Sequence, residues 1–168
     1  SSRYEKIKFS LHYNFEDLRS FQWFNYHEPK LGQYKIKLRY TGILELENFN
    51  DKEDLLMSVR TDRRQDYRKA LKNGFTHDNS IDVEILSYLQ NLTYKRQGIS
   101  VSKQEDILFS KLVDDSIRKG FGNLMVCKNK MGTPVSAVLF IHDNKCGYYL
   151  FGANDPKYRK FGTGSSVI

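Results

Sequence analysis

The 168-residue chain is 39% hydrophobic and 28% charged, a balance that is typical of globular proteins and excludes compositional disorder. No apolar stretch approaches the roughly 20 residues that cross a bilayer, and no signal-peptide core opens the chain, so we expect a cytoplasmic protein without a membrane span. The net charge of +7 favours a polyanionic partner, such as nucleic acid, a phosphate-rich cofactor or an anionic membrane surface. A generally basic surface would explain the charge equally well.

The first fifty residues predict strands that are separated by an irregular aromatic segment. Apolar residues alternate in part over 4–11 and more clearly over 35–46. An aromatic run at 21–26 lies between them. We therefore expect residues 1–50 to form an N-terminal strand and aromatic segment that belongs to an incomplete upstream region.

Three helices are predicted in the middle of the chain. The first runs from the N-cap Asp51 to Gly74, which can take the left-handed conformation that ends a helix. The second runs from about Asp82 to Gly98, with its apolar residues on one face. The third spans 102–120 and opens with a capping box, in which Ser and Glu stand three residues apart.

Short runs that are rich in β-formers follow the helices, at 124–128, 135–142 and 147–152. The turn clusters between them, at 129–132 and 143–145, are short enough for antiparallel hairpins. Helices followed by a three-stranded meander predict an α+β domain over 51–168, with a mostly antiparallel central sheet flanked by helices.

A glycine-containing loop, R-x-x-G-x-G, occupies residues 159–164 directly after the last predicted strand. Gly162 and Gly164 let the backbone approach an anion closely, and backbone N–H groups at a helix start would then face it. A tight turn without a ligand is the structural alternative. Residues 165–167 look like the first turn of another helix, so we expect a domain that is truncated after this loop.

The order helix, helix, strand, strand, strand and then R-x-x-G-x-G resembles the GNAT superfamily of N-acyltransferases. The arginine-rich stretch 58–70 and the strand-to-loop stretch 148–164 are similar to the FemAB-like, or BioF2-like, branch of that superfamily. The aromatic run 21–26 is similar to an upstream segment of some of these proteins. The resemblance implies a GNAT-like fold over residues 51–168.

In such enzymes the loop holds the coenzyme A pyrophosphate, and the strand before it pairs with the pantetheine arm. The resemblance therefore implies an acyl-CoA co-substrate, such as acetyl-CoA, and no metal. The implied contact residues are Phe151, Gly152, Ala153, Arg159, Lys160, Phe161, Gly162, Thr163, Gly164 and Ser165. A backbone N–H near the strand end would stabilise the developing oxyanion.

Tyr149 and Asp155 are the candidate catalytic residues. The Tyr149 hydroxyl could protonate the thiolate leaving group, and the Asp155 carboxylate could act as a general base. Each has a structural alternative, because Tyr149 can pack in the core and Asp155 can form the turn before Pro156.

Two further sets of side chains could bind the acceptor. Aromatic faces stack on sugar rings while Asn and His bond hydroxyls, which suggests a pocket formed by Trp23, Asn25, Tyr26 and His27. A helical spacing of i, i+4, i+8 would place three guanidinium groups in one stripe, formed by Arg60, Arg64 and Arg68. The stripe could hold a phosphorylated acceptor, such as a nucleotide- or lipid-linked sugar, or be a solvated basic face.

The cysteines and histidines predict no metal site. Cys127 and Cys146 lie in apolar, strand-like contexts without C-x-x-C spacing, so we expect reduced thiols. His12, His77 and His142 also lack metal-ligand spacing.

The leading functional hypothesis is N-acylation of an amino sugar or similar polar acceptor, by direct attack of the amine on the thioester, in polysaccharide or cell-envelope biosynthesis. The first alternative is a FemAB-type peptidyltransferase of cell-wall synthesis that takes aminoacyl groups from tRNA. The second alternative is a non-catalytic, basic nucleic-acid-binding module, which the arginine stripe and the 14% aromatic content suggest.

Overall fold

A computed structural model describes residues 7–168 and divides the chain into two compact units, Ser1–Asn48 and Phe49–Ile168. The described part of the first unit contains a short helix α1 (Arg19–Gln22) and two 3₁₀-helices, η1 (Pro29–Leu31) and η2 (Leu46–Asn48). Several of its aromatic rings contact one another. The ring centroid of Phe21 lies 5.5 Å from that of Phe9 and 5.3 Å from that of Tyr34, so this unit contains a small aromatic cluster.

The prediction of strands in the first unit is wrong for its described residues. Residues 35–46 contain no strand before η2 begins, residues 7–11 contain none, and residues 4–6 lie outside the described part. A strand needs a neighbouring strand to which its backbone N–H and C=O groups can hydrogen-bond. The alternating apolar side chains are also not buried, since Leu38 is 81% and Tyr40 98% exposed.

The helix predicted over 51–74 is divided in two, α2 (Lys52–Ser58) and α3 (Thr61–Lys72). Asp51 caps α2 as predicted, because its side chain accepts a hydrogen bond from the Asp54 N–H at 2.8 Å. The two residues between the helices have extended backbones. Arg64 donates to the Met57 carbonyl at 2.9 Å and so satisfies an oxygen that the interrupted helix leaves free.

The next two helices are confirmed as α4 (Val83–Gln97) and α5 (Lys103–Arg118). Gly98 ends α4 in the left-handed conformation at φ 68°, and Ser102 opens α5 with the predicted capping box. Among residues 7–168, no helix is long and apolar enough to cross a membrane.

The sheet has four antiparallel strands in the order β1-β2-β3-β4, and the three predicted strands are confirmed within it. The strands are β1 (Thr76–Ser80), β2 (Gly122–Lys128), β3 (Pro134–His142) and β4 (Gly147–Asn154). The first strand, THDNS, was not predicted because it contains no apolar residue. It forms because its backbone pairs with β2, from Thr76 opposite Lys128 to Ser80 opposite Leu124.

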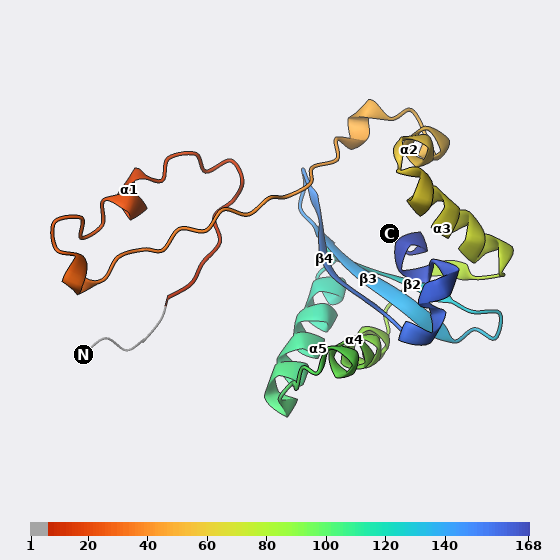
Figure 1. The fold of residues 1–168 in the computed structure, drawn as a ribbon. Helices are drawn as coiled ribbons and strands as arrows, with labels where there is room; N and C mark the ends of the chain where they lie inside the picture. Colours follow the sequence, from red (N-terminus) through yellow and green to blue (C-terminus); the bar gives the residue numbers. More distant parts are fainter. Residues whose placement is uncertain (1–6) are drawn as a thin grey trace. The chain divides into compact units, whose positions relative to one another are not determined.

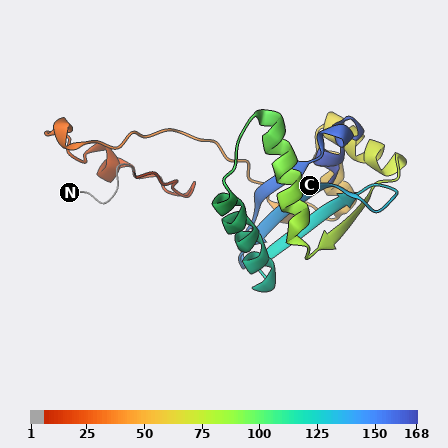
Figure 2. The ribbon, with the colours of Figure 1, turned by 90° about the horizontal axis from the view of Figure 1, so that it is seen from below.

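Helices cover both faces of the sheet. Helices α4 and α5 lie on one face, and α3 lies on the other beside the C-terminal segment (Figures 1 and 2). The C-terminal segment contains the 3₁₀-helix η3 (Pro156–Phe161) and helix α6 (Thr163–Ser166). Successive strand residues face opposite layers: Val126 and Ala137 belong to the core beside α4 and α5, Cys127 and Val138 to the core beside α3. The predicted α+β class, with a mostly antiparallel central sheet flanked by helices, is confirmed by this arrangement.

A β-bulge interrupts β4, the edge strand of the sheet. Phe140 pairs with Tyr149 and Leu139 pairs with Phe151, so Leu150 is an extra residue. Residues 149 and 152 would point to opposite faces of a regular strand, and the extra residue brings them onto the same face. Asn154, two residues further along, shares this face and lies beside Gly164 of α6.

The two cysteines are expected to differ strongly in reactivity. Cys127 is fully buried, and burial raises the pKa of its thiol to about 11, whereas Cys146 is partly exposed. Alkylation with iodoacetamide at pH 8, followed by mass spectrometry, should modify Cys146 in the native protein and Cys127 only after unfolding. Equal rates at both thiols would contradict the burial of β2.

Candidate functional site

A cleft of about 220 Å³ lies where the middle of β3, the C-terminal part of β4, the end of α4 and the C-terminal segment meet. Helix α4 contributes Thr93 and Arg96, and the C-terminal segment contributes Arg159, Gly164 and Val167. Strand β4 contributes Tyr149, Gly152, Ala153 and Asn154. The cleft therefore brings together five residues that the sequence implicated: Tyr149, Gly152, Ala153, Arg159 and Gly164.

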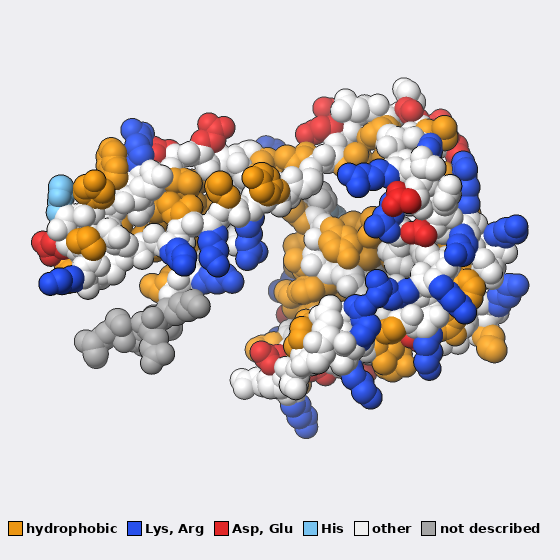
Figure 3. All heavy atoms as spheres, viewed as in Figure 1, with side chains coloured by type: hydrophobic (Ala, Val, Ile, Leu, Met, Phe, Trp, Pro, Cys, Tyr) orange, Lys and Arg blue, Asp and Glu red, His pale blue; other side chains and the backbone are white. Residues whose placement is uncertain are grey.

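The cleft is positively charged. Its lining contains two guanidinium groups and no carboxylate. Arg96 stands in the last turn of α4 and Arg159 in η3, and neither has an ion-pair partner among residues 7–168. Lys and Arg side chains also gather around the C-terminal segment in Figure 3. Two unpaired guanidinium groups facing one cleft favour an anionic ligand.

Gly152 and Tyr149 fit together on the cleft face of β4. A Cβ atom at position 152 would clash with the Tyr149 hydroxyl, so this placement of the tyrosine requires glycine there. The Tyr149 ring also lies edge-on to Phe140, with the centroids 5.9 Å apart. The Tyr149 side chain is half exposed (53%), so its hydroxyl lies over the strand and remains accessible from the cleft.

The two glycines of the loop serve different contacts. Gly162 joins η3 to α6 at φ 77°, and a Cβ there would lie 2.6 Å from the Asp66 carbonyl oxygen of α3. Gly164 lines the cleft, where a Cβ would lie 2.8 Å from the Asn154 side-chain nitrogen. Gly162 thus permits close packing against α3, while Gly164 keeps the cleft open.

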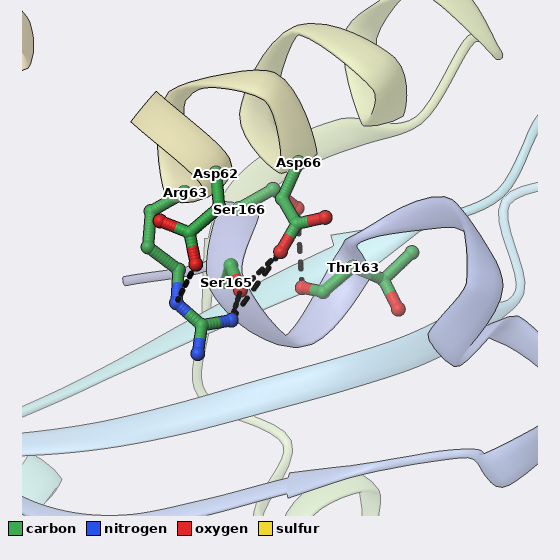
Figure 4. Close-up of polar contacts among 6 residues, drawn as sticks. All are labelled: Asp62, Arg63, Asp66, Thr163, Ser165 and Ser166. Carbon is green, nitrogen blue, oxygen red and sulfur yellow. Dashed lines mark hydrogen bonds and ion pairs between the residues drawn. The ribbon is translucent and has the colours of Figure 1, made fainter. Parts of the chain in front are cut away.

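The hydroxyl groups after Gly162 are bonded within the protein. Ser165 donates to the Asp66 carboxylate at 2.9 Å and accepts from the Arg63 guanidinium at 2.8 Å (Figure 4). Thr163 is fully buried, and its hydroxyl lies 3.4 Å from the Tyr158 carbonyl oxygen. Neither side chain lines the cleft.

Strand β1 also contacts α6. The His77 Nε2 atom lies 3.0 Å from the Ser166 hydroxyl, which donates to the Thr163 carbonyl at 3.1 Å. Burial, and secondly the positive charge of Lys52, lower the pKa of His77 below its ordinary 6.5. The neutral imidazole is therefore the form that the folded protein favours.

We expect His77 to make folding pH-dependent. Because its pKa is lower in the folded than in the unfolded state, the unfolded chain binds more protons near pH 6, and stability falls as the pH drops from above 6.5 toward the folded-state pKa. Urea unfolding at pH 7.5 and 5.5 should show a smaller loss of stability for His77→Gln than for the wild type. Identical losses would contradict this.

Two predicted cofactor residues pack in the cores instead of lining the cleft. The Phe151 ring meets Phe109 of α5 edge-on, with the centroids 4.7 Å apart, on the face of α4 and α5. Phe161 packs in the opposite core, with its ring centroid 5.6 Å from that of Phe75. Their side chains contribute to the position of β4 and η3.

Two other predicted residues lie at the ends of η3. The Asp155 side chain caps η3 by accepting the Lys157 N–H at 2.9 Å, which is the turn-forming alternative considered for it. Lys160 is exposed, and its Nζ atom lies 5.2 Å from the Phe161 ring centroid. Neither residue lines the cleft.

The predicted acceptor pocket lies in the first unit. Trp23 and Tyr26 are exposed (65% and 63%), and Tyr26 meets His27 edge-on with ring centroids 5.3 Å apart. Asn25 has a left-handed backbone at φ 54° and donates to the Gly32 carbonyl at 2.8 Å. The four residues thus form one exposed, hydrogen-bonded turn.

The predicted stripe of Arg60, Arg64 and Arg68 is only partly helical. Arg60 precedes α3 and has an extended backbone, so only Arg64 and Arg68 are one turn apart on the helix. Arg64 is engaged with the Met57 carbonyl and with the Thr61 hydroxyl at 3.2 Å. The interruption between α2 and α3 is the reason for the difference.

The cleft residues that were not identified from the sequence include Thr93, Arg96 and Asn154. A basic residue in the last turn of a helix is favoured by the helix dipole, so the sequence alone does not indicate that Arg96 belongs to a binding site. The position of Arg96 beside β4 depends on how α4 crosses the sheet, which periodicity does not give. No group of three or more metal-ligating side chains occurs within residues 7–168.

Comparisons with known proteins agree with this geometry. Residues 57–168 match the family described as the acetyltransferase (GNAT) domain. Among solved structures, the chain is similar to FemX, with a TM-score of 0.59 and 19% identity over 70% of this chain and 45% of that chain. It thus spans less than half the length of FemX, and a comparison with curated proteins finds no match. The chain belongs to the acetyltransferase (GNAT) domain family.

Proposed function

We propose that this domain transfers an acyl group from an acyl-CoA to the amine of an amino sugar or a similar polar acceptor. The observation that supports this most directly is the cleft itself. It joins the end of β4, Gly164 and two arginines that have no ion-pair partner among residues 7–168, and no carboxylate lines it. A pyrophosphate-bearing donor satisfies this charge, and its flexible arm can extend along the open edge of β4.

In this reaction, different residues would bind the phosphates, stabilise the oxyanion and transfer protons. Arg96 and Arg159 neutralise the phosphates, while a backbone N–H of Gly152 or Ala153 donates to the acyl oxygen. When bound, an acyl-CoA supplies a thioester that an amine can attack directly. The Tyr149 hydroxyl, held over Gly152, gives its proton to the departing sulfur. Asp155 lies outside the cleft lining, where its side chain accepts the Lys157 N–H, and is the second candidate for moving a proton, as acceptor from the amine.

Two separate candidates for acceptor recognition are the exposed turn of the first unit and, independently of it, the remaining arginines of α3. Trp23 and Tyr26 offer two exposed aromatic faces, on which a sugar ring can stack. Arg68 is exposed and can pair with the phosphate of a nucleotide- or lipid-linked sugar. We place this reaction in the cytoplasm, in the synthesis of cell-envelope polysaccharides.

Calorimetric titration of the full-length protein with coenzyme A tests the donor. We expect a dissociation constant between about 1 μM and 1 mM, the usual range for enzyme substrates. Pantetheine, which lacks the pyrophosphate, is the matched control and should bind at least about tenfold more weakly, because it cannot engage the arginines. If neither ligand produces heat, the acyl-CoA proposal fails.

An aminoacyl-tRNA donor is the second candidate. The similarity to FemX and the net charge of +7 favour it. In that case the protein should bind charged tRNA more tightly than coenzyme A, and log K should fall steeply as the logarithm of the salt concentration rises. A flat salt dependence, together with binding of coenzyme A, would leave acyl-CoA as the donor.

A further inference from the structure

Helix α6 is very short, and a single residue of α3 contacts both of its ends. The helix spans only Thr163–Ser166. On one side, the backbone of Asp66 closely approaches Gly162, so that a Cβ there would lie 2.6 Å from the Asp66 carbonyl oxygen. On the other side, the Asp66 carboxylate accepts the Ser165 hydroxyl at 2.9 Å. Asp66 therefore contacts this segment twice, through its backbone at Gly162 and through its carboxylate at Ser165.

Arg63 completes this contact from one turn earlier on α3. The Arg63 Nη1 atom donates to the Ser165 hydroxyl at 2.8 Å and to the Asp66 carboxylate at 3.3 Å (Figure 4). The three side chains thus bond one another pairwise. Asp62 touches only the edge of this group, with its carboxylate 3.9 Å from the Arg63 guanidinium.

The bonding assigns a different role to Ser165 than that of a phosphate ligand. A serine hydroxyl has one proton, and Ser165 gives it to Asp66. Its lone pair meanwhile accepts from Arg63. The hydroxyl is therefore used to attach α6 to α3, and the side chain does not line the cleft.

We propose that Asp66 and Arg63 are positioning residues that fix α6, through Ser165, so that Gly164 and Arg159 face the donor cleft in one arrangement. The inference rests on the proposed function, because the cleft is taken to hold the donor. A turn that is already fixed lets the ligand bind without the cost of ordering it. The arginine-rich helix thereby acts on the donor indirectly and needs no contact with it.

Coenzyme A binding to the full-length protein tests this inference. We expect Asp66→Ala and Ser165→Ala each to raise the dissociation constant and the KM for the donor about fivefold, which is the scale of one lost side-chain hydrogen bond. The value of kcat at saturating donor and the KM for the acceptor should stay unchanged. Asp66→Asn keeps an acceptor for Ser165 and should recover part of the affinity. Asp62→Ala is the matched control and should remain within about twofold of the wild type.

A double-variant cycle separates positioning from general loss of stability. Because Asp66 and Ser165 act through one contact, Asp66→Ala/Ser165→Ala should bind coenzyme A no more weakly than either single variant. Leu71→Gly, at an exposed position of α3 outside the core that contains Val167, should lower the melting temperature with little change in affinity. Unchanged affinity in Asp66→Ala and Ser165→Ala, or fully additive losses, would overturn the inference.

Hydrogen exchange tests the attachment of α6 to α3 in the absence of any ligand. If the wild type does not bind coenzyme A, the proposed function fails, and the attachment of α6 is then judged without ligand. The amides of residues 165–167 should exchange at least about fivefold faster in Ser165→Ala than in the wild type. Equal exchange in the two proteins would refute the attachment itself.

Discussion

Replacing Gly162 with alanine is expected to destabilise the protein by about 3 kcal/mol and to abolish donor binding. The left-handed backbone, at φ 77°, costs a residue with a Cβ about 1–2 kcal/mol. The new Cβ would also lie 2.6 Å from the Asp66 carbonyl oxygen and 2.7 Å from its Cα, and such overpacking costs about 1–3 kcal/mol. Helix α6 would have to move away from α3, which would carry Gly164 out of the cleft.

Gly120→Ala is the matched control for this substitution. Gly120 has the same φ of 77°, but a Cβ there would meet nothing within 4 Å. Its replacement should cost only the backbone strain, about 1 kcal/mol, and should leave coenzyme A binding unchanged. Urea unfolding and calorimetry of both variants provide the measurements. Equal losses of stability would show that the contact between Gly162 and Asp66 does not exist in solution.

The second large effect concerns the two arginines of the cleft. We expect Arg96→Ala and Arg159→Ala each to weaken coenzyme A binding about tenfold, and the double variant about a hundredfold, because each guanidinium group offers charge-assisted hydrogen bonds to phosphate. Both side chains are exposed and lack ion-pair partners among residues 7–168. Their removal should therefore change the melting temperature little.

Lys95→Ala provides the control for Arg96. Lys95 precedes Arg96 in the last turn of α4 but does not line the cleft. It carries the same charge, so it reports the general effect of removing a cation from this helix end. Affinities of Lys95→Ala and Arg96→Ala for coenzyme A can be compared by calorimetry. A similar loss in both would indicate long-range attraction instead of a specific contact, and no loss in Arg96→Ala would remove α4 from the donor site.

The elements that the sequence predicts well are those with local signals at their ends. The capping box at Ser102, the N-cap Asp51 and the left-handed Gly98 each define a helix end through interactions within a few residues. Strands β2, β3 and β4 were predictable because they are apolar and joined by short turns. Their order, followed by the glycine loop, was sufficient to identify the family.

The elements that the sequence did not predict depend on distant partners. Strand β1 has no apolar residue and exists through its pairing with β2, about fifty positions later in the chain. The alternation over 35–46 has no such partner among the described residues of its own unit, 7–48, and yields no strand. The break at Val59 and Arg60 likewise depends on Arg64, which reaches back to the Met57 carbonyl.

The sequence drew attention to the segment that borders the cleft, but not to all of the residues that line it. Of the two loop glycines, Gly162 packs against α3 while Gly164 lines the cleft. The sequence could not show that Ser165 bonds Asp66, which lies 99 positions away. Arg96 entered the site only through the crossing of α4 over the sheet.

Hydrogen exchange of the full-length protein, with and without coenzyme A, tests the location of the donor site most directly. Binding in the cleft should slow exchange in peptides that cover the end of β4 and α6, residues 149–166, and in the last turn of α4 around Arg96. Peptides from the β2–β3 turn, at 129–133, should not change. Protection confined to other parts of the chain, or no protection at a saturating concentration of coenzyme A, would contradict an acyl-CoA site in this cleft.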